Sequence, residues 1–411
     1  MQRNPVTIQI QTETPGTAAA ARPHPFWGRA FRPFFLGVGV FGFVFTLAWT
    51  AIWRGALGAP VWLPLPWWHA HEMLFGLVAA AISGFALTAV AVWTGRPALC
   101  GRPLAALFGV WVLGRLAMAG AGHLPAALVA AVDLAFLPLA LASFLRSLWG
   151  TGQWRNYGVA ALLAALTLAN AAVHAQALGL SEASAPRALR FAVDLVVTLI
   201  VVIGGRITPG FTTNALLRAG IPARAQSRPR LDQLAVAAVV ALAAGDLLVP
   251  RSTATGLLAA AGALTVAARM SGWKTLHTLR DPLVWSLHAG MAWVVIGLLL
   301  VAASDLGAPV APAAGLHALT AGAMGSMILA VVTRVSLGHT GRPLVLPRGA
   351  VAIYGLVHAG AALRVLAALA LAGDPLSWLL VAGLLWASAF GLFAVLYGAI
   401  LLGPRADGNP G

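Results

Sequence analysis

Long apolar runs alternate with short, arginine-bearing polar loops along almost the whole chain. A transmembrane helix needs about 20 mostly apolar residues, and on this rule we expect twelve spans. They are predicted at residues 34–53, 71–93, 103–121, 124–146, 157–178, 188–205, 231–250, 254–270, 281–302, 312–335, 350–371 and 376–402. The predicted fold is an all-α membrane protein, a bundle of about 12 transmembrane helices.

The composition supports the same fold class. Of the 411 residues, 60% are hydrophobic and 9% are charged, whereas soluble globular proteins carry about 25% charged residues. Lipid must therefore surround most of the molecule. The net charge of +15 does not indicate a nucleic-acid partner, because the arginines fall in short loops between apolar runs. The single cysteine, Cys100, excludes a disulfide framework, an iron–sulfur cluster and a c-type haem attachment.

The distribution of Lys and Arg predicts the orientation. With both termini on one side of the membrane, 20 of the 26 Lys and Arg residues lie on that side, four lie opposite and two lie within helices. The positive-inside rule then places both termini in the cytoplasm. We expect a disordered cytoplasmic arm over 1–30, which lacks the apolar core of a signal peptide, a membrane domain over 31–403, and a tail over 404–411.

Histidines recur at one level of the predicted bundle. The stretch WHAHEMLFG (68–76) opens the second span with His69, His71, Glu72 and a methionine, and His317 opens the tenth span at the same level. Imidazole suits haem iron and copper. Ionisable groups inside a membrane are costly, so each is a candidate for function. We therefore treat these residues as a candidate metal site.

Two further histidines and two arginines lie deeper in the predicted spans. His288 and His358 are expected near the membrane midplane, and Arg115 and Arg364 at matching depths between them and the membrane face. A cation near a haem-bound histidine suits haem propionates, as with Arg364 and His358. Arg115 has an alternative role as a buried ion pair with Asp133 of the neighbouring span. The remaining histidines are interpreted as solvated helix ends or loop residues: His24, His123, His174, His277 and His339.

Short motifs recur every four spans. TGRP follows the second span (94–97) and the tenth (340–343), and GGRITPG (204–210) follows the sixth. This spacing predicts three pseudo-repeats of four helices, although two short matches also arise by chance. Twelve helices built this way would share the plan of haem–copper oxidase catalytic subunits, which is an analogy of architecture only.

Several stretches together resemble the NnrS family: FRPFFLGVGVF (31–41), WHAHEMLFG, WTGR (93–96), GGRITPGFT (204–212), LHAG (287–290) and LHALTAGAMGSMILAVVTRVSLGHTGRP (316–343). The resemblance covers nearly the whole chain from residue 32 onward. It implies a twelve-helix protein of the bacterial inner membrane that contains haem and copper and takes part in nitric oxide metabolism, denitrification and nitrosative-stress defence. It also implies a ligand pool of His69, His71, His288, His317 and His358, without dividing it between the metals.

One division is our working hypothesis for the haem. A haem b is held axially by His288, His358 or both, and Arg364 and Arg115 are the other cofactor-binding residues. The absence of a C-x-x-C-H sequence means that histidine alone would hold this haem.

The remaining residues of the pool are assigned to copper. His69, His71 and His317 hold the metal, and Glu72 is the catalytic, proton-handling group. Iron would bind nitric oxide, and copper would bind a second molecule or accept an electron. The electron donor is unknown.

Three classes of function stay open. The first is an oxidoreductase that reduces nitric oxide. The second is a non-catalytic haem-based sensor or sink for nitric oxide. The third is a 12-helix secondary transporter, although the loop after the second span, WTGRPALCGRP, lacks the D-R-x-G-R-R type of transporter signature.

Overall fold

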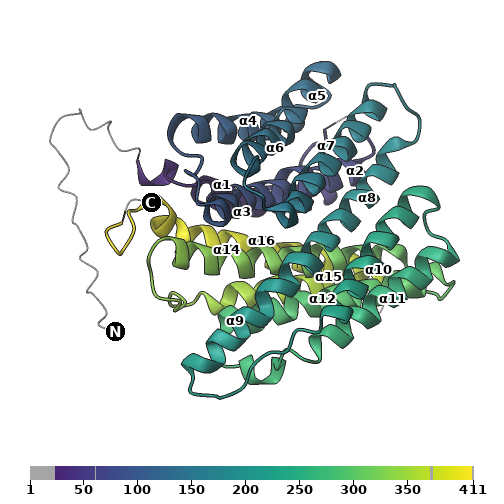
Figure 1. Cartoon of the computed structure of the whole chain (residues 1–411). Coiled ribbons are helices and arrows are strands. Elements are labelled where there is room, and N and C mark those ends of the chain that lie inside the picture. Colours follow the sequence, from purple (N-terminus) through teal and green to yellow (C-terminus); the bar gives the residue numbers. More distant parts are fainter. Residues whose placement is uncertain (1–23, 61, 371–373, 410–411) are drawn as a thin grey trace, which may run out of the picture.

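A computed structural model describes residues 24–60, 62–370 and 374–409 (Figure 1). These residues form helices and no strand, and twelve of the helical stretches are long and apolar enough to cross a membrane. The predicted fold class is confirmed, and the chain is a multi-pass membrane protein. The predicted arm over 1–30 falls mostly outside the described residues, so the division into arm, membrane domain and tail stays a prediction.

Seven spans are single α-helices. They are α1 (Phe31–Trp53), α4 (Gly101–Ala119), α10 (Pro229–Leu248), α11 (Thr253–Met270), α12 (Pro282–Asp305), α15 (Val351–Ala368) and α16 (Pro375–Leu402). The fourth span joins α5 (Ala126–Leu134) to α6 (Phe136–Leu148), and the fifth joins the short helix η3 (Trp154–Asn156) to α7 (Tyr157–Ala177). Their ends lie close to those that hydropathy predicted.

The second, sixth and tenth spans each contain a π-helical segment. The second runs α2 (Leu65–His71), η2 (Glu72–Val78), α3 (Ala79–Thr94). The sixth runs α8 (Ser184–Leu199), η4 (Ile200–Gly204), α9 (Gly205–Arg218), and the tenth runs α13 (Pro312–His317), η6 (Ala318–Met324), α14 (Gly325–His339). π-Helical turns are rare and frequently mark functional sites.

These three spans form the centre of the bundle. Their most apolar windows are 89%, 61% and 67% buried, whereas the values for the other nine spans lie between 28% and 56%. A helix that is apolar all round is expected to be surrounded by protein or lipid. The three central spans are surrounded mainly by the other helices of the bundle. The recurrence of the π segments every four spans agrees with the predicted three-by-four plan, which nevertheless stays a prediction.

The sixth span is longer than predicted. The predicted end at 205 is wrong, because the helix continues as α9 to Arg218 with Pro209 inside it. Hydropathy ends the span where glycine, arginine and proline interrupt the apolar run. Membrane helices tolerate proline because neighbouring groups satisfy the freed backbone atoms.

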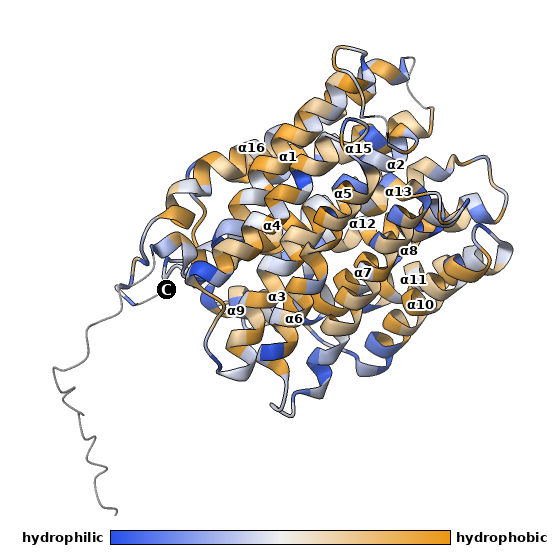
Figure 2. Cartoon of the chain, turned by 90° about the horizontal axis from the view of Figure 1, so that it is seen from above, coloured by the Kyte–Doolittle hydropathy of each residue, from blue (hydrophilic) through white to orange (hydrophobic). Residues whose placement is uncertain are grey.

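The two ends of the bundle differ in what they carry. The first described residues and the C-terminal residues lie together at one end (Figure 1), where Arg32 Nη1 donates to the carbonyl oxygens of Leu401 and Gly403 at 2.9 and 2.6 Å. We call this the terminal end. The opposite end, where α2, α5, α8 and α13 begin, is called the His69 end. Hydrophobic residues cover most of each helix between the two ends (Figure 2).

Candidate functional site

Six buried polar side chains meet near the His69 end, and we call them the His71 group. They come from four spans, and each is at most 8% exposed. The members are His71 and Glu72 of the second span, Arg115 of α4, Asp133 of α5, and Asn170 and His174 of α7. So many polar groups at the centre of an apolar bundle need full hydrogen bonding to be tolerated.

Arg115 joins two carboxylates. Its Nη1 pairs with Glu72 and its Nη2 with Asp133. Gly76, within η2, makes room for the guanidinium, because a Cβ there would lie 2.8 Å from Nη1. The alternative that sequence reasoning left open, an ion pair between Arg115 and Asp133, is present and extends to a second carboxylate.

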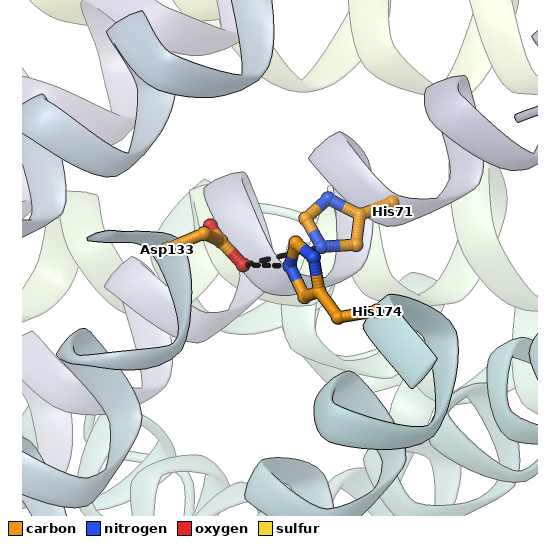
Figure 3. A group of neighbouring side chains, drawn as sticks. All are labelled: His71, Asp133 and His174. Carbon is orange, nitrogen blue, oxygen red and sulfur yellow. Dashed lines mark hydrogen bonds and ion pairs between the residues drawn. The ribbon is translucent and has the colours of Figure 1, made fainter. Parts of the chain in front are cut away.

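Asp133 is the hub of the group (Figure 3). Its Oδ1 accepts from Arg115, and its Oδ2 accepts from Asn170 Nδ2 at 2.8 Å and from His174 Nε2 at 2.9 Å. His71 Nε2 lies 3.3 Å from the same Oδ2. Four side chains from three other spans therefore fix the position of this carboxylate.

His71 faces hydrogen-bond acceptors on both sides of its ring. Nδ1 lies 3.0 Å from Glu72 Oε1, and Nε2 lies 2.8 Å from Asn170 Oδ1. The Asn170 amide nitrogen already donates to Asp133, so its oxygen is the atom turned towards His71. An imidazole donates from both nitrogens only when doubly protonated. Protonation gives His71 a positive charge. Together with the Arg115 guanidinium, this charge balances the two carboxylates.

The same atoms are a plausible set of metal donors. His71, Asp133 and His174 each offer a ligand atom, and the three atoms lie within 4.8 Å of one another. His174 Nδ1 is also buried, without a hydrogen-bond partner in the described part of the chain. Two imidazoles and a carboxylate suit copper, iron or zinc. Arg115, which donates to Oδ1, and Asn170, which donates to Oδ2, would orient the carboxylate.

His69 lies on a different face of α2 from His71. Its ring stacks on Trp49 at 4.1 Å between centroids and packs parallel to Phe45. The buried Nδ1 of His69 has no hydrogen-bond partner among the described residues. The two adjacent histidines of the WHAHEM motif thus belong to two different groups.

The second group, which we call the His317 group, consists of His69, His317 and Arg364. His317 Nδ1 donates to the carbonyl oxygen of Ala313 at 2.8 Å, which leaves the lone pair on Nε2. Arg364 of α15 is half-buried and lies within electrostatic range of both rings. A ring that donates Nδ1–H to a backbone carbonyl is the usual arrangement of a histidine metal ligand.

His288 is not brought to either group. It lies in α12 near the terminal end, where Nε2 is 2.8 Å from Thr212 Oγ1 and Nδ1 is 2.9 Å from Thr275 Oγ1. The Thr212 hydroxyl donates its proton to the carbonyl oxygen of Thr208, so it accepts a hydrogen bond from His288 Nε2. Thr275 must then donate to His288 Nδ1. Both ring nitrogens are occupied.

His358 is also apart, in the middle of α15. Its Nδ1 accepts from the indole N–H of Trp293 at 3.0 Å. Since an indole can only donate, the proton of the neutral ring lies on Nε2. That nitrogen is buried without a partner in the described residues. The ring is therefore arranged to donate a hydrogen bond from Nε2.

Sequence reasoning overlooked two members of the His71 group. His174 was interpreted as a solvated helix end, and Asn170 was not singled out. The two are spaced i, i+4 in an otherwise apolar span, so they share one face of α7. That spacing was the signal that points both side chains at the same neighbour.

Comparison with known proteins supports the same overall picture. No curated protein matches the chain. A family model described as "NnrS protein" matches residues 25–405, which is nearly the whole chain. This match agrees with the resemblance that the sequence motifs carry. The chain belongs to the NnrS family.

Proposed function

We propose that this protein binds nitric oxide at a centre formed by a haem b and a copper ion, near the His69 end of a bundle in the bacterial inner membrane. Family membership indicates a membrane protein related to nitric oxide. The observation that carries the finer proposal is that α2 holds two donor groups back to back, with His71 on one side and His69 on the other. The arginine distribution supports cytoplasmic termini and a periplasmic His69 end.

The His71 group fits copper by its donors and its charge. With neutral histidines, its two carboxylates and one guanidinium leave the group one positive charge short. Copper(I) supplies one charge and accepts imidazole ligands. His71, His174 and Asp133 would hold the ion, and Glu72 would accept a hydrogen bond from His71 Nδ1. This set keeps His71 from the original hypothesis and replaces His69 and His317.

The His317 group fits haem better than His288 and His358 do. His288 offers no free ring nitrogen, and His358 presents a proton. His69 and His317 each have a nitrogen without a protein partner among the described residues. Arg364, within electrostatic range of both, is suited to bind propionates. Arg115 is committed to Glu72 and Asp133, so we now assign it to the copper side.

When bound, haem and copper supply an open coordination position and one-electron chemistry. The chain's own contribution is positioning and proton handling. Glu72 and His71 are in hydrogen-bond contact at 3.0 Å, so a proton can be held at either atom of the pair. Arg115 keeps Glu72 in place. The surrounding apolar helices exclude bulk water, which strengthens every one of these interactions.

An apolar cavity offers nitric oxide a place to partition. It is a partly open pocket of about 90 Å³, lined by Phe35 of α1 and by residues of the three central spans, including Ala81, Ile200, Gly204, Met327 and Ile328. Dry apolar cavities of comparable size bind xenon and small apolar molecules. Nitric oxide is a small diatomic of low polarity, so the cavity is expected to concentrate it between the central spans.

Metal analysis of purified variants tests the assignment. His71→Gln and His174→Gln should lose copper and keep the haem Soret band, whereas His69→Gln and His317→Gln should lose the Soret band first. His277→Gln, at an exposed loop position, is the matched control and should keep both. Retention of both metals in all four site variants would refute the proposed centre.

A gas titration then separates the classes of function. Consumption of nitric oxide with an electron donor indicates a reductase, and stoichiometric binding without consumption indicates a sink or sensor. A purified wild-type protein with no Soret band and no copper would favour the transporter. Ala81→Phe, which fills the cavity, should slow nitric oxide binding several-fold relative to the lipid-facing control Ala106→Phe, with unchanged metal content.

A further inference from the structure

A second buried ionic group lies near the His69 end, between α8 and α10. Arg190 Nε donates to Asp246 Oδ2 at 2.8 Å and lies 3.7 Å from Asp194 Oδ2, one turn along α8. Asp194 is 2% exposed and Asp246 is fully buried. We call Arg190, Asp194 and Asp246 the Asp194 group. Neither the family match nor the proposed metal centre gives it a role.

The carboxylates of this group lack donors. Both oxygens of Asp194 and the Oδ1 of Asp246 have no hydrogen-bond partner in the described part of the chain. The hydroxyl oxygen of Thr198, one turn further along α8, is likewise buried without a partner. A buried carboxylate that accepts no hydrogen bond is strongly disfavoured in a medium of low polarity. Asp194 is therefore not accommodated as an anion.

The charge count leads to the same conclusion. Two buried carboxylates face one guanidinium, which leaves one negative charge uncompensated. Among the described residues, a further charged group near the pair is Asp305 at the end of α12, which is partly exposed and accepts from Thr255 at 3.0 Å. It adds negative charge. The group requires one further positive charge from a source outside these side chains.

A proton is the charge that fits best. The Asp194 and Asp246 carboxyl groups lie 3.7 and 2.8 Å from the same Arg190 Nε, and two buried carboxyls this close together favour the binding of one proton because it is costly to ionise both. A divalent ion would overcompensate the charge, and hard cations of this kind need six or more oxygen ligands. A protonated Asp194 would also donate the hydrogen bond that the pair lacks.

We propose that Asp194 and Asp246 together hold one exchangeable proton, in a site distinct from the metal centre. Arg190, whose side chain is 18% exposed, and the partly exposed Asp305 connect the pair to the surface at the His69 end. Protons therefore exchange with that side of the membrane. The ligand is the proton itself, and its binding does not require haem, copper or nitric oxide.

Infrared difference spectroscopy of the wild-type protein during a pH titration tests the proposal. We expect a carbonyl stretch of a protonated carboxyl group at neutral pH that shifts in D₂O and disappears at high pH. Asp194→Asn, which mimics the protonated form, should lose the band and keep its thermal stability. Asp407→Asn, an exposed tail position, should leave the band unchanged.

Two results would overturn the proposal. One is the absence of any protonated carboxyl band in the wild-type protein, a measurement that requires no variant to fold. The other is a higher melting temperature of the wild type in sodium chloride than in choline chloride at fixed pH, together with loss of this difference in Asp194→Asn. That result would make the group a sodium site. Both measurements are made on metal-free and metal-loaded protein, so they do not depend on the proposed function.

Discussion

The His71 group and the Asp194 group contain the same ionic core, two buried carboxylates on either side of one arginine, yet they solve the resulting charge problem differently. In the His71 group, Asn170 and two histidines surround the carboxylates with donors. In the Asp194 group, three carboxylate oxygens have no donor among the described residues. The first group is therefore built to hold its positive charges in place. The second is built to bind and release a proton.

The largest effect is expected from removing the arginine of the first group. Arg115→Gln leaves Glu72 and Asp133 without the guanidinium that pairs with both, and breaking a buried pair in this way costs about 3–5 kcal/mol. Arg190→Gln should cost less, about 1.5–3 kcal/mol, because protons can already compensate the Asp194 group. Thermal unfolding in detergent or nanodiscs measures both. Equal losses would erase the distinction between the two groups.

Removal of the amide that links His71 to Asp133 should have the next largest effect. Asn170→Ala takes away the hydrogen bond to Asp133 that remains when His71 Nε2 binds the metal, and such supporting contacts are worth about 10–100-fold in metal affinity. Competition with a copper(I) chelator measures the change. The control is Asn156→Ala, which removes an amide that donates to Gln153 near the terminal end. If copper affinity is unchanged in Asn170→Ala, this group does not hold the metal.

A smaller effect is expected from crowding the Arg115 guanidinium. Gly76→Ala places a methyl group 2.8 Å from Nη1, which should cost about 1 kcal/mol because the guanidinium must shift against its pairing with Glu72 and Asp133. Gly109→Ala in α4 meets no atom within 4 Å and should stabilise the helix slightly. The difference between the two melting temperatures reports how closely η2 is fitted to Arg115. Equal melting temperatures would show that η2 is not closely packed against Arg115.

The smallest effect concerns the partly exposed neighbour of the Asp194 group. Asp305→Asn removes a negative charge that favours proton binding, so the midpoint of the infrared titration should move to lower pH by less than about one unit. Without this negative neighbour the pair binds its proton less tightly, so the midpoint moves to lower pH and not to higher pH. A shift to higher pH, or no shift at low salt, would show that Asp305 does not act on the pair.

The fold followed from the sequence because lipid allows few alternatives. Continuous apolar runs in a chain this poor in charge can only be spanning helices, so the number of spans and most of their ends were predicted correctly. The largest difference is in the sixth span, since an apolar run ends at Gly204 whereas the helix does not, and the second span begins six residues earlier than predicted, at Leu65. Hydropathy measures solvent preference, and a helix that leaves the apolar layer keeps its backbone hydrogen bonds.

The candidate site followed from the sequence only in part. Depth along a helix can be counted, so Arg115 and Asp133 were placed at one level. Which way a side chain points around the helix axis depends on its neighbours, and this is why His69 and His71 were assigned to one metal although they face different groups. Asp194 and Asp246 were missed because Arg190 was only counted, as one of the four Lys and Arg residues on the face opposite the termini, although its i, i+4 spacing to Asp194 indicates a buried pair.

The π segments have a consequence for how such a centre can change. Each extra residue in a helical turn rotates everything beyond it by about 100° around the axis. In the second and tenth spans the histidines stand immediately before such a segment. Deleting a single residue from η2 or η6 would restore a regular α-helix and turn His71 or His317 towards a different neighbour. In these spans, the insertion or loss of one residue would change which neighbours the histidines face, with no substitution of the histidines themselves.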